Sequence, residues 1–156
     1  MSKNENVIDA LNAPTPKERI NFRVGFKNKT NTKACMLAYI DARYVMDRLD
    51  YAVGKDKWSA DYNVVGDNLF CTITINWPDG SVTHKTDCGM ETEVDAEKGQ
   101  ASDAFKRAAV HYGIGRDLYS MPQYWADVDN GYVDRDWKPK GWDSSAQHDN
   151  SRPTTT

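Results

Sequence analysis

The sequence has few of the residues that build disulfide frameworks, metal centres or membrane spans. Its 156 residues include three cysteines, an odd number without CxxC spacing, and three histidines that lie far apart. We therefore expect no disulfide framework, no zinc site and a reducing, cytoplasmic compartment. No apolar run approaches the roughly 20 residues of a membrane-spanning helix, and the first residues lack the apolar segment of a signal peptide. The sequence predicts no association with a membrane.

Motifs of common catalytic sites are also missing. The glycine pair Gly113 and Gly115 follows a predicted helix, whereas a phosphate-binding glycine loop follows a strand and opens a helix. There is no nucleophile elbow, P-loop or Cys/His dyad. Acidic residues gather over 79–97, so a metal-dependent nuclease is one alternative hypothesis. Their irregular spacing is more typical of a solvated acidic loop. We expect no enzymatic activity, no metal and no cofactor.

Charge is present but unevenly distributed. The net charge is −3, which argues against a uniformly basic binder of nucleic acid. Residues 1–34 nevertheless carry seven basic side chains against three acidic ones, and residues 61–100 carry two basic against eight acidic. A polyanion would therefore meet local basic surfaces. Five Trp and eight Tyr provide aromatic rings for a core and for stacking on bases.

Composition divides the chain into three expected regions. A basic N-terminal arm covers residues 1–34, a core domain covers 35–125, and a C-terminal extension covers 126–156. The extension is expected to be disordered from about residue 143, because its polar composition cannot form a packed core. In the arm, we expect one short helix around Asn6–Leu11.

The end of the arm gives a weak strand pattern. Phe22, Val24 and Phe26 alternate with Arg23 and Lys27, which predicts a strand with the three apolar residues on one face. The lysines of this region suit a solvated arm and a nucleic-acid contact equally well.

The core is expected to begin with a long amphipathic helix. Apolar residues recur at helical spacing over Cys35–Val53, and Gly54 ends the pattern. On the polar face, Arg43 and Asp47 have the spacing of an ion pair.

Three strands and a second helix follow. Alternating apolar residues and short turns predict an antiparallel meander with these strands: Trp58–Val65, Leu69–Trp77 and Ser81–Cys88. Apolar residues at Ala101, Ala104, Phe105, Ala108 and Tyr112 then predict one buried face of a helix over 98–112. This order has no βαβ alternation. It indicates an α+β fold with a helix, a three-stranded meander and a helix packed on the sheet.

The second helix carries Lys106 and Arg107 on the sides away from its apolar stripe. Alone, such a pair is most often a solvated surface. Further basic residues lie on the other core elements: Arg43, Lys55, Lys57 and Lys85. Basic side chains that line a groove beside exposed aromatic rings are typical of sequence-independent binding to single-stranded nucleic acid.

Four blocks of residues carry a family resemblance, and they occur in this order: YID at 39–41 with VM at 45–46, Gly54 with Trp58, DGS at 79–81, and ASDAFKRA at 101–108 with Gly113. The order and spacing resemble the Rad-fifty-two/Rad-twenty-two-type single-strand annealing proteins, in particular their short phage and bacterial members. The resemblance covers about residues 38–119.

The resemblance implies a β-β-β-α core that assembles into a ring or helical filament. A basic groove around the outside of that assembly would hold single-stranded DNA with its bases displayed for pairing. Such proteins anneal complementary strands without ATP in homologous recombination and DNA repair. An exonuclease or a single-strand-binding protein would be a further partner, and a bacterial cytoplasm the location. A DNA-end-protecting binder without annealing activity is the alternative.

The resemblance also assigns residues. Lys106 and Arg107 match the basic pair of the family's groove. The family's basic residue in the first helix falls at Tyr44, with Arg43 one place earlier, and a further basic position falls at Val110. The candidate DNA-binding residues are therefore Lys106, Arg107, Arg43, Tyr44, Lys55, Lys57, Lys85 and Arg116.

Overall fold

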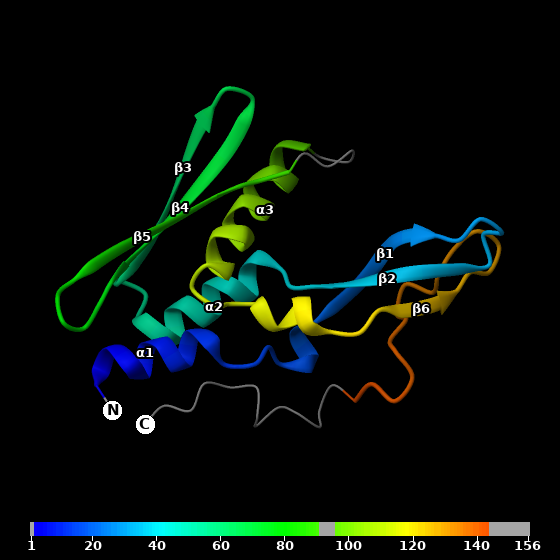
Figure 1. Ribbon diagram of the computed structural model, residues 1–156, viewed down its shortest axis with the longest axis horizontal. Coiled ribbons are helices and arrows are strands. Elements are labelled where there is room, and N and C mark those ends of the chain that lie inside the picture. The colour runs from blue at the N-terminus through cyan, green and yellow to red at the C-terminus, as the bar shows by residue number, and fades with distance from the viewer. Residues whose placement is uncertain (1, 91–95, 144–156) are drawn as a thin grey trace.

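The computed structural model describes residues 2–90 and 96–143. Residues 91–95 of the expected acidic loop, and the C-terminal residues from 144 onward, lie outside these residues. The elements, in chain order, are α1 (Lys3–Asn12), η1 (Lys17–Arg19), β1 (Asn21–Lys27), β2 (Lys33–Tyr39), α2 (Ala42–Val53), β3 (Trp58–Val65), β4 (Asn68–Asn76), β5 (Val82–Cys88), α3 (Ala96–Val110), η2 (Arg116–Ser120) and β6 (Tyr124–Asp127). They form two antiparallel three-stranded sheets, and α2 and α3 lie between these sheets (Figure 1). The α+β fold is confirmed.

The sheet β3-β4-β5 is the antiparallel meander that the sequence predicts. At the β4–β5 turn, the Asp79 carboxylate accepts a hydrogen bond from the Ser81 N–H at 2.9 Å. One face of the sheet is covered by α3. Ile73 and Ile75 of β4 are fully buried together with Ala104 and Ala108 of α3. The small alanines let the helix lie close to the sheet, as expected from the apolar stripe.

The predicted helix over Cys35–Val53 is wrong in its first third. Those residues belong to β2, and α2 begins only after Asp41, whose carboxylate accepts a hydrogen bond from the Tyr44 N–H at 2.8 Å. The reason is that β2 is the central strand of a second sheet, β1-β2-β6. A strand covered on both faces has consecutive buried residues, here Ala34–Met36, and lacks the alternation that identifies a half-exposed strand.

A β-bulge in β1 changes which residues share a face. The pairing with β2 shifts between Val24 and Phe26, so that Arg23 pairs with Leu37 and Phe26 pairs with Cys35. Arg23 and Phe26 therefore face the same side. The expected common face for Phe22, Val24 and Phe26 is wrong, because one inserted residue reverses the alternation after it.

The two faces of this sheet have different neighbours. Phe22 lies in an aromatic cluster with Tyr124 and Trp137, which belongs to a small core built on Ala34, Met36 and Ala126. Phe26 lies on the opposite face, edge to face with Trp125 of β6. β6 is absent from the sequence prediction. It follows the short 3₁₀ helix η2.

The N-terminal residues are integrated with the core. The expected short helix is confirmed as α1, and it lies against α2. Arg48 of α2 is buried and donates hydrogen bonds to the carbonyl groups of Ala10, at 2.9 Å, and Ala13, at 3.1 Å. The ion pair expected between Arg43 and Asp47 is replaced by one between Arg19 and Asp47 at 3.0 Å. No helix in the described residues is long and apolar enough to cross a bilayer.

Candidate nucleic-acid interface

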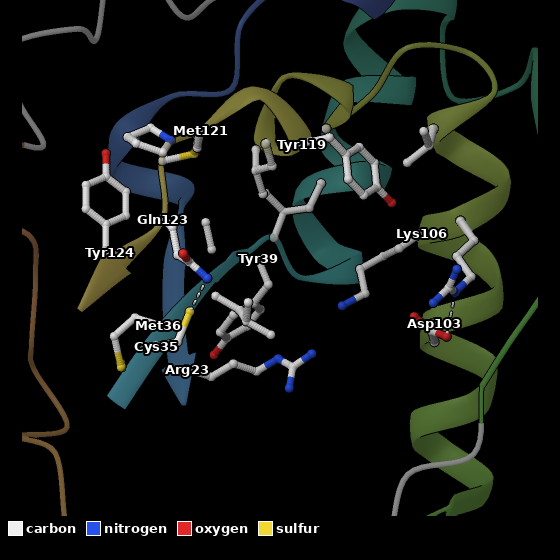
Figure 2. Close-up of a pocket in the computed structure, with 18 of the residues that line it drawn as sticks. Arg23, Cys35, Met36, Tyr39, Asp103, Lys106, Tyr119, Met121, Gln123 and Tyr124 are labelled. Atoms are coloured by element: carbon white, nitrogen blue, oxygen red, sulfur yellow. Dashed lines mark hydrogen bonds and ion pairs between the residues drawn. The ribbon is translucent and has the colours of Figure 1, made fainter. Parts of the chain in front are cut away.

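A groove of about 510 Å³ lies between α3 and the β1-β2 strand pair. One wall is the exposed side of α3, and the other is the face of β1 and β2 that carries Arg23, Leu37 and Tyr39 (Figure 2). The segment 118–124, which includes η2 residues, closes one end. The groove therefore depends on both the predicted core and the strand that the sequence places in the arm.

Two cations face each other across this groove. Figure 2 shows Lys106 reaching from α3 toward Arg23 on β1. Partial burial lowers the pKa of Lys106, and repulsion from Arg23 lowers it further, while the Asp103 carboxylate opposes the shift. The Lys106 amine lies 5.7 Å from the centre of the Tyr39 ring, a cation–π distance. Like charges that face each other in a partly desolvated groove favour an anion between them.

Arg107 adds a third cation one residue further along α3. Its Nε donates a hydrogen bond to Asp103 Oδ2 at 2.9 Å. This hydrogen bond raises the pKa of Arg107, which stays fully charged. Because Asp103 contacts Nε, the guanidinium still has its Nη donors to offer to a second acceptor.

Aromatic rings lie at the edges of the basic cluster. Tyr39 lies beneath Lys106, and Tyr119 of η2, 73% exposed, lines the groove. η2 is held to the N-terminal segment by Thr15, whose N–H and hydroxyl donate to the Asp117 carboxylate at 2.9 and 2.7 Å. Gly115 immediately precedes η2 with φ of 77°, a backbone conformation that favours glycine. The groove thus combines cationic hydrogen-bond donors suited to phosphate with an aromatic ring suited to stacking.

Comparison with known proteins identifies the family of this chain. Residues 3–137 match the family described as Rad52/22 family double-strand break repair protein. This chain belongs to the Rad52/22 family. It is 41% identical over 130 residues to the single-stranded DNA-binding protein DdrA of Deinococcus radiodurans, and 41% identical over 129 residues to DdrA of Deinococcus deserti. The matches cover 82% and 79% of this chain, and 62% and 61% of the two relatives. The chain thus spans less than two thirds of their length.

In this Rad52/22 family member, the groove brings together only part of the predicted set. Of the eight candidates, Lys106 and Arg107 line it. Tyr44 is 4% exposed, and its hydroxyl accepts a hydrogen bond from Arg48 at 2.6 Å. Arg116 donates to the Val110 carbonyl at 2.7 Å, at the C-terminus of α3. Tyr44 and Arg116 therefore have structural contacts.

The remaining candidates are exposed but lie elsewhere in the described structure. Arg43 is on the surface of α2, and Lys55 and Lys57 lie in the turn between α2 and β3. Lys85 of β5 lies 5.9 Å from the Tyr112 ring centre. Within the described residues, these four do not line the groove.

The predicted set lacks several charged or aromatic residues that line the groove, among them Arg23, Tyr39 and Tyr119. Tyr39 belongs to a recognised motif, but the helix predicted there conceals its position on a strand. Arg23 is one of seven basic residues in the arm, and only the pairing of β1 with β2 places it opposite Lys106. Tyr119 has no local signal.

The acidic residues give no metal centre in the part of the chain that is described. There, no three His, Cys, Asp or Glu side chains gather as metal ligands would. Asp87 Oδ2 instead lies 2.9 Å from Nε2 of His111, the residue that follows α3. Asp79 is used in the β4–β5 turn.

Proposed function

We propose that this chain binds single-stranded DNA in the groove between α3 and the β1-β2 strands and anneals complementary strands without ATP. The facing pair of Arg23 and Lys106 carries the proposal. These two cations repel each other in the free protein, so a phosphate between them would replace repulsion by two attractions. Arg107 would contact the same or the next phosphate through its Nη donors.

The aromatic residues suit a single strand better than a duplex. A duplex keeps its bases stacked on each other, whereas a single strand can place a base on an exposed ring such as Tyr119. The groove lining contains apolar Leu37 and Leu118 beside the charged residues, so it offers surface for bases as well as for phosphates. The relatives are named for binding to single-stranded DNA, which is the same polymer.

We also propose that the chain acts as a ring or helical filament. Exposed apolar side chains outside the groove lining include Trp125 on the β1-β2-β6 sheet, and Tyr62, Val64 and Val65 on the β3–β4 hairpin. The two sheets lie on opposite sides of the helices (Figure 1). Contact between unlike surfaces of successive copies is the geometry that gives rings or filaments. Electron microscopy with and without DNA tests this, and monomers under both conditions contradict it.

Annealing is tested with two complementary oligonucleotides, one of them fluorescent, in EDTA and without ATP. Faster pairing in the presence of protein supports the proposal. Binding without faster pairing supports the end-protecting alternative, and cleavage that requires magnesium supports the nuclease.

The site is tested by Lys106→Ala combined with Arg107→Ala. The variant should bind single strands at least about tenfold more weakly and with a lower salt dependence, because a protein that makes fewer phosphate contacts releases fewer counterions on binding. The matched control is Lys55→Ala with Lys57→Ala, which makes the same change in net charge outside the groove. Equal losses in both variants would show that overall charge, and not this groove, determines binding.

A further inference from the structure

Asp103 is the one acidic side chain among the described residues that line the groove. The same lining contains three cations, Arg23, Lys106 and Arg107. Its carboxylate accepts a hydrogen bond from Arg107 Nε at 2.9 Å and increases the stability of the charged form of Lys106. The carboxylate is therefore the internal counter-ion of the surface on which we place DNA phosphates.

The contacts of Asp103 extend beyond an ordinary ion pair between residues four apart on a helix. The same oxygen, Oδ2, accepts a hydrogen bond from the Met90 N–H at 2.8 Å. The Asp103 side chain is 29% exposed and that of Arg107 43%, so solvent screens the pair only in part. The backbone contact keeps the carboxylate in place when Arg107 is drawn away.

We infer that Asp103 is an internal competitor of DNA phosphate at Arg107 and that this competition keeps the bound strand exchangeable. The inference rests on the proposed function of the groove. A phosphate that contacts the Nη donors of Arg107 shares the guanidinium with the carboxylate at Nε, so repulsion between the two anions offsets part of the attraction. When the phosphate leaves, the carboxylate still holds Nε, and no unpaired guanidinium remains in the groove.

Exchangeability has a direct use in annealing. A protein that binds one strand too tightly holds that strand after its complement has paired. A competing carboxylate lowers affinity without removing a cation, so it shortens the lifetime of the complex more than it slows encounter. Asp103 is thus a residue that tunes affinity through Arg107.

The test is Asp103→Asn, which removes the charge but keeps an oxygen for Met90 and Arg107. Single-strand affinity should rise about two- to fivefold, the range of a partly exposed ion pair. The dependence of log K on log salt should steepen by up to about 0.7, the value for one additional phosphate contact on a single strand. Annealing at saturating protein should slow, because the strands dissociate later. Asp103→Ser provides the same test if the asparagine variant folds poorly.

Two controls isolate the mechanism. Asp47→Asn removes the carboxylate of the Arg19–Asp47 pair, at 3.0 Å, which lies outside the groove lining, and should leave affinity unchanged. In the Arg107→Ala background, Asp103→Asn should lose most of its effect on single-strand affinity, because the Asp103–Arg107 pair is already absent. A structural role for Asp103 would give weaker binding in every background.

Failure of this inference and failure of the proposed function would give different results. If wild-type protein binds single strands but Asp103→Asn binds them equally or more weakly, the inference is wrong and the proposed function stands. A rise that Asp47→Asn reproduces, or that persists without Arg107, also overturns the inference. If wild-type protein does not bind single-stranded DNA, the proposed function itself fails.

Discussion

Replacement of Arg23 by alanine should weaken DNA binding while leaving the fold as stable as before or slightly more stable. Arg23 and Lys106 come from different elements, β1 and α3, and their like charges face each other across the groove. The free protein therefore holds a repulsion between these two cations, which Asp103 opposes and which a bound phosphate would relieve further. Loss of Arg23 removes this repulsion and also one of three cations that would contact phosphate.

The magnitudes follow from this geometry. Arg23 lies on the surface, so the free energy of unfolding should change by no more than about 0.5 kcal/mol, and in the stabilising direction. For binding, three phosphate contacts at about −0.7 each on a single strand become two, so the salt slope should fall to about two thirds. This ratio does not depend on how many copies of the chain share one strand. Lys106 should also titrate at higher pH, because its repulsive neighbour is gone.

The assay is fluorescence anisotropy with a labelled oligonucleotide over a series of salt concentrations, together with urea unfolding. Arg135→Ala is the matched control, because Arg135 is exposed and outside the groove lining. An Arg23→Ala variant that binds with the wild-type salt slope would refute the pairing of Arg23 with phosphate. A variant that loses more than about 1 kcal/mol of stability would refute the repulsion.

Two further outcomes are expected. Arg48→Ala should lower the free energy of unfolding by about 2–4 kcal/mol in urea titrations. The reason is that Arg48 is buried and donates hydrogen bonds to carbonyl groups at the end of α1. A loss below about 1 kcal/mol would contradict this role. Tyr119→Ala should weaken single-strand binding at least about fivefold and abolish quenching of a 2-aminopurine base, whereas Tyr119→Phe retains both, because stacking needs the ring and not the hydroxyl. Equal effects of the two Tyr119 variants would contradict stacking.

The sequence predicts the β3-β4-β5 meander and α3 well because their signals are local. Alternation and short turns determine the strands, and the apolar stripe of α3 needs only one sheet face to cover it. Lys106 and Arg107 are found for the same reason, since the residues that bury one side of a helix also determine which side is exposed.

The rest of the groove depends on pairing between distant segments. Residues Ala34–Met36 of β2 are buried on both faces of the sheet, so they give the continuous apolar run of a buried element and can be mistaken for a helix. β6 is recognisable as a strand only once β2 is there to pair with it. Arg23 becomes part of the site through this second sheet. No pattern in residues 1–34 distinguishes it from the other basic residues nearby.

The bulge at Gly25 determines which side chains of β1 line one wall of the groove. Arg23 and Phe26 are three residues apart, and an unbroken strand would turn one of them away from the groove. A Cβ at Gly25 would lie 2.7 Å from Leu37, so the extra residue also fits closely against the same wall. Regular pairing of Gly25 with β2, without the bulge, would exchange a cation for an apolar side chain on this wall without altering any amino acid. The position of the bulge therefore determines, together with the residues themselves, what this wall presents to a ligand.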